Sequence, residues 1–178
     1  VGGWIDISSS PTGTTLLMLD RTLPMDVNFV GVDDSHEMLV KCESKLREHQ
    51  VKRKVELQCT DLHLGVDMKD ASLALMVLTL QFLRPLHRER LIADVFKGLR
   101  ENGGLILVEK VLGEDSHFNR LFIKHYYDFK RRNGYSETEI AQKREALENV
   151  LIPYKLLENR EMLLRTGFRH GDRVFKWY

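Results

Sequence analysis

The feature that most constrains the fold is an alternation of short apolar runs with longer amphipathic segments, which continues to about residue 111. Short apolar runs are typical of buried parallel strands, and apolar residues at helical spacing are typical of the helices between them. This order predicts a doubly wound α/β fold, in which a mostly parallel sheet carries helices on both faces. The expected strands cover 4–7, 27–32, 54–58, 71–80 and 105–108, and the expected helices cover 14–23, 38–50 and 85–100.

Residues at the ends of these helices are suited to capping. Ser35 can accept a hydrogen bond from the first turn of the second helix, and Pro85 fits the first turn of the third. Asn102, Gly103 and Gly104 then provide a turn with positive φ before the fifth strand. The run 71–80 is the most continuously apolar stretch, so we expect it to be a central strand.

The alternation stops after residue 111, and two consecutive helices are expected within residues 114–149. Asn133 and Gly134 separate the two, and Ser136 with Glu139 forms a capping box for the second. We interpret this pair as a helical lid inserted after the fifth strand.

The remaining residues predict a helix at 154–165, capped by Gly167, and a strand at 174–178. Residues 1–178 then form one domain. Because predicted strands lie at both ends and the edge of a sheet needs partners, we expect further N- and C-terminal segments.

The composition favours a soluble cytoplasmic protein. Lys and Arg number 27 and Asp and Glu number 26, so the net charge of +1 gives no overall attraction to nucleic acid or membrane. Cys42 and Cys59 have neither metal nor disulfide spacing, and no apolar run is long enough to cross a membrane. We therefore expect no metal and no membrane partner.

An acid pair ends the second expected strand at Asp33 and Asp34. The glycine of the preceding turn, Gly13, lies 20 residues upstream of Asp33. This spacing is expected between a nucleoside-binding loop and the acid that holds its ribose. The alternative is that these aspartates only start a helix, since Asp caps helices well.

A second acid, Asp61, follows the third expected strand at the same edge of the sheet. One carboxylate there can accept both ribose hydroxyls, and another can accept from the amine of adenine. A surface loop acid is the simpler alternative. The loop 8–13 lacks the Gly-x-Gly-x-x-Gly pattern, and a serine-rich turn favours an amino-acid carboxylate over a pyrophosphate.

Two basic clusters occur in the predicted lid, at 130–132 and 143–144. Most such clusters are solvated helix faces. Over a ligand crevice, however, an arginine can pair with a carboxylate through two hydrogen bonds.

Residues in and around this region resemble one family of enzymes. The segments 128–136, 140–144 and 147–150 resemble carboxy-S-adenosyl-L-methionine synthases, many of which carry the older label of tRNA (uridine-5-oxyacetic acid) methyltransferase. Residues 79–83, Glu109, Lys110 and 166–168 also match, and the resemblance runs from about residue 6 to 177.

The resemblance implies a Rossmann-like class I methyltransferase fold with a two-helix insertion after strand five. It implies that S-adenosyl-L-methionine binds, or its carboxylated or S-adenosyl-L-homocysteine form, without a metal. The family carboxylates the sulfonium methyl group at the expense of prephenate, releases phenylpyruvate and supplies the modification of wobble uridine in tRNA. Family members are homodimers.

The resemblance also assigns roles to individual residues. Asp33 and Asp34 match the ribose-binding acids, and Asp61 and Leu62 match the pair that flanks the adenine. Arg144 matches the arginine that binds the new carboxylate, which makes it the candidate catalytic residue.

The sequence departs from the family pattern in two places. Ser8, Ser9 and Ser10 stand where the family has Gly-Cys-Ser beside the cofactor, and Val77 stands where it has a cofactor-contacting asparagine. Two alternatives therefore remain: direct methyl transfer to tRNA through the local basic patch, which the net charge does not favour, and a non-catalytic relative that binds S-adenosylmethionine.

Overall fold

The computed structural model describes residues 3–8 and 12–177. The chain forms two compact units, Val1–Glu109 and Lys110–Tyr178. The first unit contains the α/β sheet, and the second contains the helices that follow it.

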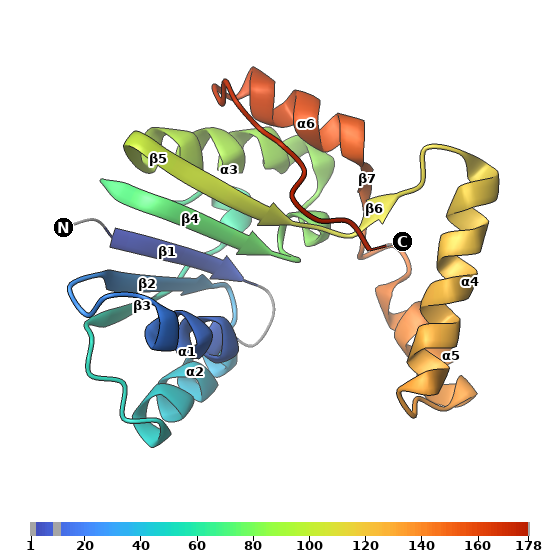
Figure 1. The fold of residues 1–178 in the computed structure, drawn as a ribbon, viewed down its shortest axis with the longest axis horizontal. Helices are drawn as coiled ribbons and strands as arrows, with labels where there is room; N and C mark the ends of the chain where they lie inside the picture. Colours follow the sequence, from blue (N-terminus) through green and yellow to red (C-terminus); the bar gives the residue numbers. More distant parts are fainter. Residues whose placement is uncertain (1–2, 9–11, 178) are drawn as a thin grey trace. The chain divides into compact units, whose positions relative to one another are not determined.

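A five-stranded parallel sheet forms the centre of the first unit (Figure 1). Its strand order is β3-β2-β1-β4-β5, and every neighbouring pair is parallel. This confirms the predicted α/β fold, with β4 as an interior strand between β1 and β5. The strands are β1 (Gly3–Ser8), β2 (Asn28–Asp33), β3 (Val55–Cys59), β4 (Ala71–Val77) and β5 (Leu99–Val108).

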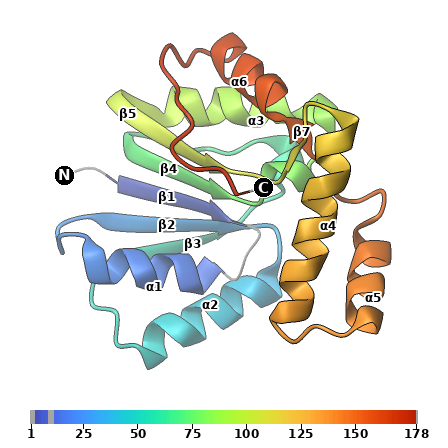
Figure 2. The same ribbon diagram turned by 45° about the vertical axis from the view of Figure 1, so that its right-hand side comes forward.

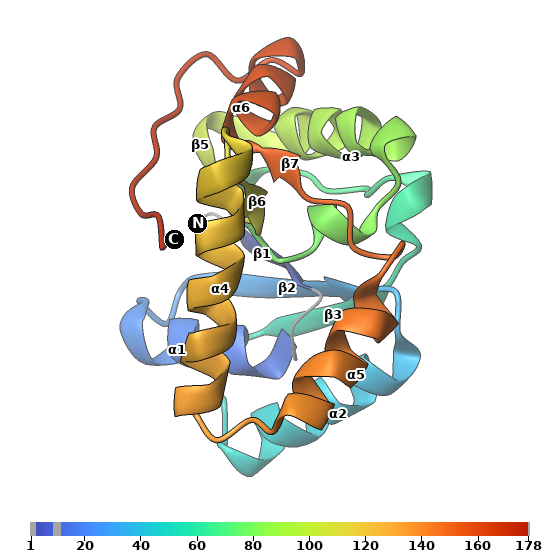
Figure 3. The ribbon, with the colours of Figure 1, turned by 90° about the vertical axis from the view of Figure 1, so that its right-hand side faces the viewer.

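Helices cover both faces of this sheet (Figures 1 and 3). The helices α1 (Thr12–Thr22) and α2 (His36–Glu48) lie on one face, and α3 (Pro85–Gly98) lies on the other. Right-handed crossovers produce this arrangement, because the chain leaves β1 in one direction along the sheet and β4 in the other. Two short 3₁₀ helices follow strands, η1 (Leu62–Leu64) after β3 and η2 (Leu80–Phe82) after β4.

Apolar side chains are packed on both faces. Leu91, Ile92 and Val95 of α3 are completely buried, as their helical spacing predicts. On the other face, Leu16 of α1, Phe29 of β2 and Cys42 of α2 belong to one core cluster.

The element boundaries follow from local backbone conformation. The Ser35 side chain accepts from the Met38 amide (3.3 Å), so α2 begins at His36, two residues before the predicted start. β4 ends at Val77, because Leu78 adopts the left-handed region with φ of 55°. Asn102 has φ of 62° inside β5, where pairing with β4 skips from Leu99 to Gly104, so the predicted turn interrupts the strand.

In the second unit the helices α4 (Ser116–Arg132) and α5 (Glu137–Leu147) lie side by side (Figures 2 and 3). Asp115 accepts hydrogen bonds from the first turn of α4, and the predicted capping box of Ser136 and Glu139 is present on α5. Two helices therefore occupy the predicted residues. Their role as a lid stays a prediction.

The end of the second unit differs from the prediction. The short strands β6 (Val111–Leu112) and β7 (Tyr154–Lys155) pair in parallel, so α6 (Leu156–Arg165) begins two residues later than predicted. Residues 168–177 have no regular secondary structure, and the predicted strand at 174–178 is wrong over its described residues. An alternating apolar pattern suits a strand but does not supply the neighbouring strand that it must pair with.

A buried arginine holds the turn between α1 and β2 in the first unit. The side chain of Arg53 is fully buried, its Nε donates to the Asp20 carboxylate (2.6 Å), and its guanidinium lies 4.2 Å from the centre of the Phe29 ring. It also donates to four backbone carbonyls, those of Asp20, Leu23, Pro24 and Val27.

Arg53→Met should therefore lower the free energy of unfolding by about 3–5 kcal/mol, because it leaves a carboxylate and four carbonyls without their donor. Urea denaturation at neutral pH measures this. Lys52→Met, at the exposed neighbouring position, is the matched control and should change stability by less than about 0.5 kcal/mol. Equal effects of the two substitutions would contradict the proposed importance of Arg53.

Candidate functional site

The carboxyl ends of the five strands are level with one another. Ile7 pairs with Val32 and Ser8 with Val77, while Asp33 pairs with Cys59 and Val77 with Val108. Because Ile7 pairs with Val32, the residues that follow them, Ser8 and Asp33, lie at the same level of the sheet. The sheet thereby brings the loops after all five strands to one edge, which is where ligands bind in open α/β sheets.

Asp33 is a buried carboxylate at this edge, with only 5% of its surface exposed. Its Oδ1 accepts from the Ser35 amide (2.9 Å), and its carbonyl accepts from the Thr60 amide (3.0 Å). The turn after β2 and the loop after β3 are thus joined through one residue. Asp34, the next residue, is exposed. Of the two predicted ribose-binding acids, Asp33 is buried and its carboxylate is held by a hydrogen bond, whereas Asp34 is exposed.

Asp61 lies in the loop after β3 and caps η1. Its Oδ1 accepts from both the amide (2.9 Å) and the ring Nδ1 (3.1 Å) of His63. These hydrogen bonds, the backbone one first, lower the pKa of Asp61, so the group is a carboxylate at neutral pH. The His63 ring meets that of His87 edge to face, with centroids 5.4 Å apart. Leu62 is buried beside Asp61. Capping and ligand binding are compatible here, because only one oxygen of Asp61 serves the cap.

Glu109, directly after β5, is a further acid at this edge, and the sequence alone assigned no role to it. Its carboxylate accepts from the backbone amides of Thr79 (3.1 Å), Leu80 (3.0 Å) and Gln81 (2.9 Å). Burial raises the pKa of Glu109 to about 7, although these amides and Arg88 favour the charged form. The signal in the sequence was an acid at the end of an apolar strand, but nothing near it indicated which amides it would bind.

The remaining cofactor-binding candidates in this unit are only partly described. Ser9 and Ser10 lie outside the described residues, and only the backbone of Ser8 is described, at the end of β1. Val77 is half-buried at the end of β4, and its carbonyl accepts from the Thr79 hydroxyl (3.2 Å).

Arg144 lies in the last turn of α5, in the second unit. It lines a cavity of about 170 Å³ between α4 and α5, together with Tyr127 and Arg131. The two arginines differ in their partners. Arg131 forms ion pairs with Asp128 (2.8 Å) and with Glu137, and these raise the pKa of Arg131. Within the described ranges, none of the ion pairs found includes Arg144, so its guanidinium is available to an anion.

The basic cluster at 130–132 is therefore weaker as a nucleic-acid patch than its sequence indicated. The Arg131 charge is balanced by two carboxylates, and the Lys130 ammonium lies 4.7 Å from the centre of the Tyr126 ring. Arg132 donates to the Asp128 carbonyl (3.3 Å).

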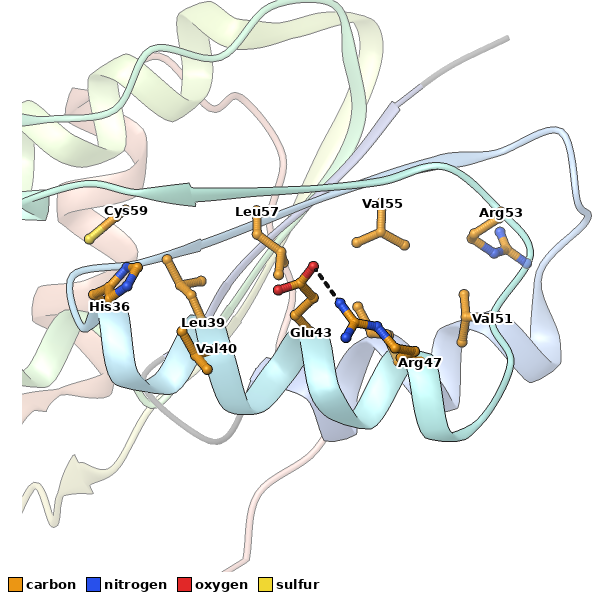
Figure 4. Close-up of a pocket in the computed structure, with 11 residues that line it drawn as sticks. His36, Leu39, Val40, Glu43, Arg47, Val51, Arg53, Val55, Leu57 and Cys59 are labelled. Carbon is orange, nitrogen blue, oxygen red and sulfur yellow. Dashed lines mark hydrogen bonds and ion pairs between the residues drawn. The ribbon is translucent and has the colours of Figure 1, made fainter.

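A separate groove of about 590 Å³ runs between α2 and β3 (Figure 4). His36 and Cys59 lie at one end of it, and Val51 and Arg53 lie at the other. Asp33 and Asp61 do not line it. The groove follows β3, an edge strand of the sheet, and it is distinct from the carboxyl edge that carries Asp33 and Asp61.

The part of the chain that the structure describes contains no group of three or more His, Cys, Asp or Glu side chains arranged to hold a metal. In the same residues, no helix is long and apolar enough to cross a membrane.

Comparisons with known proteins define the class of this protein. The sequence model of a family described as methyltransferase domain matches residues 9–103. The solved structure of the S-adenosylmethionine-dependent methyltransferase SibL has a TM-score of 0.68 to this chain at 13% identity, covering 100% of this chain and 48% of SibL. The fold is that of the class I S-adenosylmethionine-dependent methyltransferases.

Two curated relatives identify the family within that class. Carboxy-S-adenosyl-L-methionine synthase of Methylococcus capsulatus is 62% identical over 168 residues, which are 94% of this chain and 69% of the relative. The enzyme of the same name from Helicobacter pylori strain HPAG1 is 42% identical over 166 residues, 93% of this chain and 68% of the relative. The chain belongs to the carboxy-S-adenosyl-L-methionine synthase family, and the resemblance seen in the sequence is confirmed.

The environment of Glu109 predicts a pH effect on stability. Its pKa in the folded protein, about 7, lies above the ordinary value of 4.5, so the folded state holds the proton more tightly than the unfolded state. The contribution of this group to stability is therefore full below about pH 4.5 and is lost as the pH rises through about 7.

Between pH 5 and 7.5 the wild-type protein should thus lose on the order of 2 kcal/mol relative to Glu109→Gln, which cannot titrate. Denaturant unfolding of both proteins across this range measures the difference. A difference that is constant with pH would show that the Glu109 pKa is not raised.

Proposed function

We propose that this chain is a carboxy-S-adenosyl-L-methionine synthase that converts S-adenosyl-L-methionine and prephenate to carboxy-S-adenosyl-L-methionine and phenylpyruvate. Prephenate loses carbon dioxide and hydroxide as it becomes phenylpyruvate. The carbon dioxide bonds to the methyl carbon of S-adenosylmethionine, and the proton displaced from that carbon combines with the hydroxide to give water. When bound, the sulfonium supplies the acidity of that methyl group, so the protein has to position the reactants and hold the new carboxylate. Membership of the family supports this proposal directly.

The observation that carries the proposal is the position of Arg144 beside the cavity between α4 and α5, with no ion pair found for it among the described residues. Methyl transfer needs no cation near the methyl group, because the sulfonium is already positive. A carboxylated product carries an anion on that same carbon, and an arginine fork binds a carboxylate through two hydrogen bonds. The neighbouring Arg131 is neutralised by its own carboxylates, which leaves Arg144 as the cation suited to this role.

The acids of the first unit suit the adenosyl part of the ligand. In this proposal Asp33, with Asp34, accepts from the ribose hydroxyls, and Asp61 accepts from the adenine amine beside Leu62. Support comes from the level strand ends and from the fixed carboxylates of Asp33 and Asp61. Ser8, Ser9, Ser10 and Val77 then border the methionine part.

We further propose the biological setting that the family implies. The product would supply the modification of wobble uridine in tRNA, in the cytoplasm, and the active form would be a homodimer. Residues 1–178 would form a single S-adenosylmethionine-binding domain. Direct methylation of tRNA is less well supported, because the Arg131 charge of the basic cluster is already paired with Asp128 and Glu137.

The activity is tested by incubating the protein with S-adenosylmethionine and prephenate and following the cofactor by mass spectrometry. The expected result is a cofactor heavier by one carboxyl group, together with phenylpyruvate. If the cofactor gains no mass but the protein binds it, the non-catalytic alternative is correct. If methyl groups pass to tRNA instead, the methyltransferase alternative is correct.

Arg144→Ala should lower the rate of carboxylation by at least about 100-fold, because the new carboxylate loses its cation. The affinity for S-adenosylmethionine itself, measured by calorimetry, should change by less than about threefold, since that ligand lacks the added carboxylate. Arg144→Lys should fall between the wild type and Arg144→Ala, because it keeps the charge but loses the fork.

Arg120→Ala is the matched control and should keep full activity. Arg120 is an exposed arginine of α4, and none of the ion pairs found in the described residues includes it. Equal loss of cofactor binding and of activity in Arg144→Ala would mean that Arg144 is structural.

A further inference from the structure

The loop after β4 begins with a strained residue at the edge where the ligand is proposed to bind. Leu78 has φ of 55°, in the left-handed region that costs a residue with a Cβ roughly 1–2 kcal/mol. The residue is nevertheless 38% exposed, so burial of this leucine does not account for the conformation. A strained backbone persists only where its surroundings enforce it, and such residues cluster at functional sites.

The backbone of Leu78 is held on both sides. Its amide donates to the Val108 carbonyl (2.7 Å), and its carbonyl accepts from the Gln81 side-chain amide (3.4 Å). Val108 is the last residue of β5, so the first contact joins the loop to the neighbouring strand.

The residues that follow Leu78 are held by two charged side chains. Glu109 accepts from three consecutive amides, those of residues 79–81, and so replaces the side-chain cap that η2 lacks. Arg88 of α3 is 1% exposed and donates to the carbonyls of Gln81 (3.3 Å) and Leu83 (2.9 Å). The carboxylate binds the amides of the loop and the guanidinium binds its carbonyls, so the path of the backbone from Leu78 to Leu83 is fixed.

The position of Leu78 relates this loop to the proposed ligand. Leu78 directly follows Val77, and Val77 pairs with Ser8, where the loop proposed to take the methionine part begins. A partly exposed leucine at this point is suited to contact the aliphatic carbons next to the sulfonium and to exclude water from them.

We propose that Glu109 is a positioning residue that acts through Leu78: by holding residues 79–81 it keeps Leu78 in its left-handed conformation, with its side chain against the methionine part of the cofactor. This inference rests on the proposed function, because it assumes that the cofactor binds at this edge. The other reading is that Glu109 supports only the stability of the loop.

A double-mutant cycle separates the two readings, with the affinity for S-adenosylmethionine measured by calorimetry. Glu109→Gln keeps the shape of the side chain, but its amide group cannot accept from the Gln81 amide, and the affinity should fall about tenfold. Leu78→Gly adopts positive φ without strain and removes the side chain. In that background Glu109→Gln should change the affinity by less than about twofold, because Leu78 is no longer present to be positioned.

Two further variants complete the test. Leu78→Asn tolerates the left-handed conformation but replaces the apolar contact with a polar one, so by itself it should weaken binding about tenfold. The affinity of Leu78→Asn tests whether Leu78 contacts the cofactor even if Glu109→Gln fails to fold. Glu101→Gln makes the same change at an exposed position of β5 and should leave the affinity unaltered.

Independent, additive effects of Glu109→Gln and Leu78→Gly would overturn the proposal, and so would unchanged affinity in Leu78→Asn. Failure of the proposed function gives a different result, since the wild-type protein would then not bind S-adenosylmethionine, or would bind it without carboxylating it.

Discussion

The site depends above all on the parallel pairing of five strands in one register. Because β1, β2 and β4 pair through Ile7, Val32, Ser8 and Val77, their ends cannot shift independently. Parallel strands require long crossover connections, and here these place helices on both faces and leave the carboxyl edge to loops. The alignment of Asp33, Ser8 and Val77 at one edge of the sheet thus results from backbone hydrogen bonds between the strands and not from contacts among these side chains.

The loops at this edge are then held by carboxylates that bind backbone amides. Asp33 holds the start of α2, Asp61 holds η1 and Glu109 holds η2. Each of these acids lies at the end of a strand or shortly after it, where orphan amides of the next turn are close. The arrangement keeps negative groups at the edge where a sulfonium nucleoside is proposed to bind, while the burial of Glu109 raises its pKa to about 7.

Much of this could be predicted from the sequence, because apolar periodicity and capping patterns are local. The strands, the helix cap at Ser35 and the capping box of Ser136 followed from such patterns. Contacts between distant residues could not be predicted in the same way. The amides that Glu109 binds lie about 30 residues away, and the positive φ of Leu78 has no glycine or asparagine to mark it.

Because local patterns do not predict contacts between distant residues, the structure also differs from the prediction elsewhere. The pattern at 174–177 suits a strand, but pairing requires a neighbour that a local pattern cannot specify. The basic run at 130–132 indicated a local charged patch, but Asp128 and Glu137 pair with Arg131 in the folded chain. The family resemblance, by contrast, depended on short specific segments, and the comparisons confirmed it.

The central proposal is that this chain makes a carboxylated cofactor and that Arg144 binds its new carboxylate. It is tested most directly by the mass of the small molecule released from the protein as purified from cells. The account predicts carboxy-S-adenosyl-L-methionine, which should be replaced by S-adenosylmethionine in Arg144→Ala. Release of S-adenosylmethionine or S-adenosyl-L-homocysteine alone from the wild-type protein, with no carboxylated form, would contradict it.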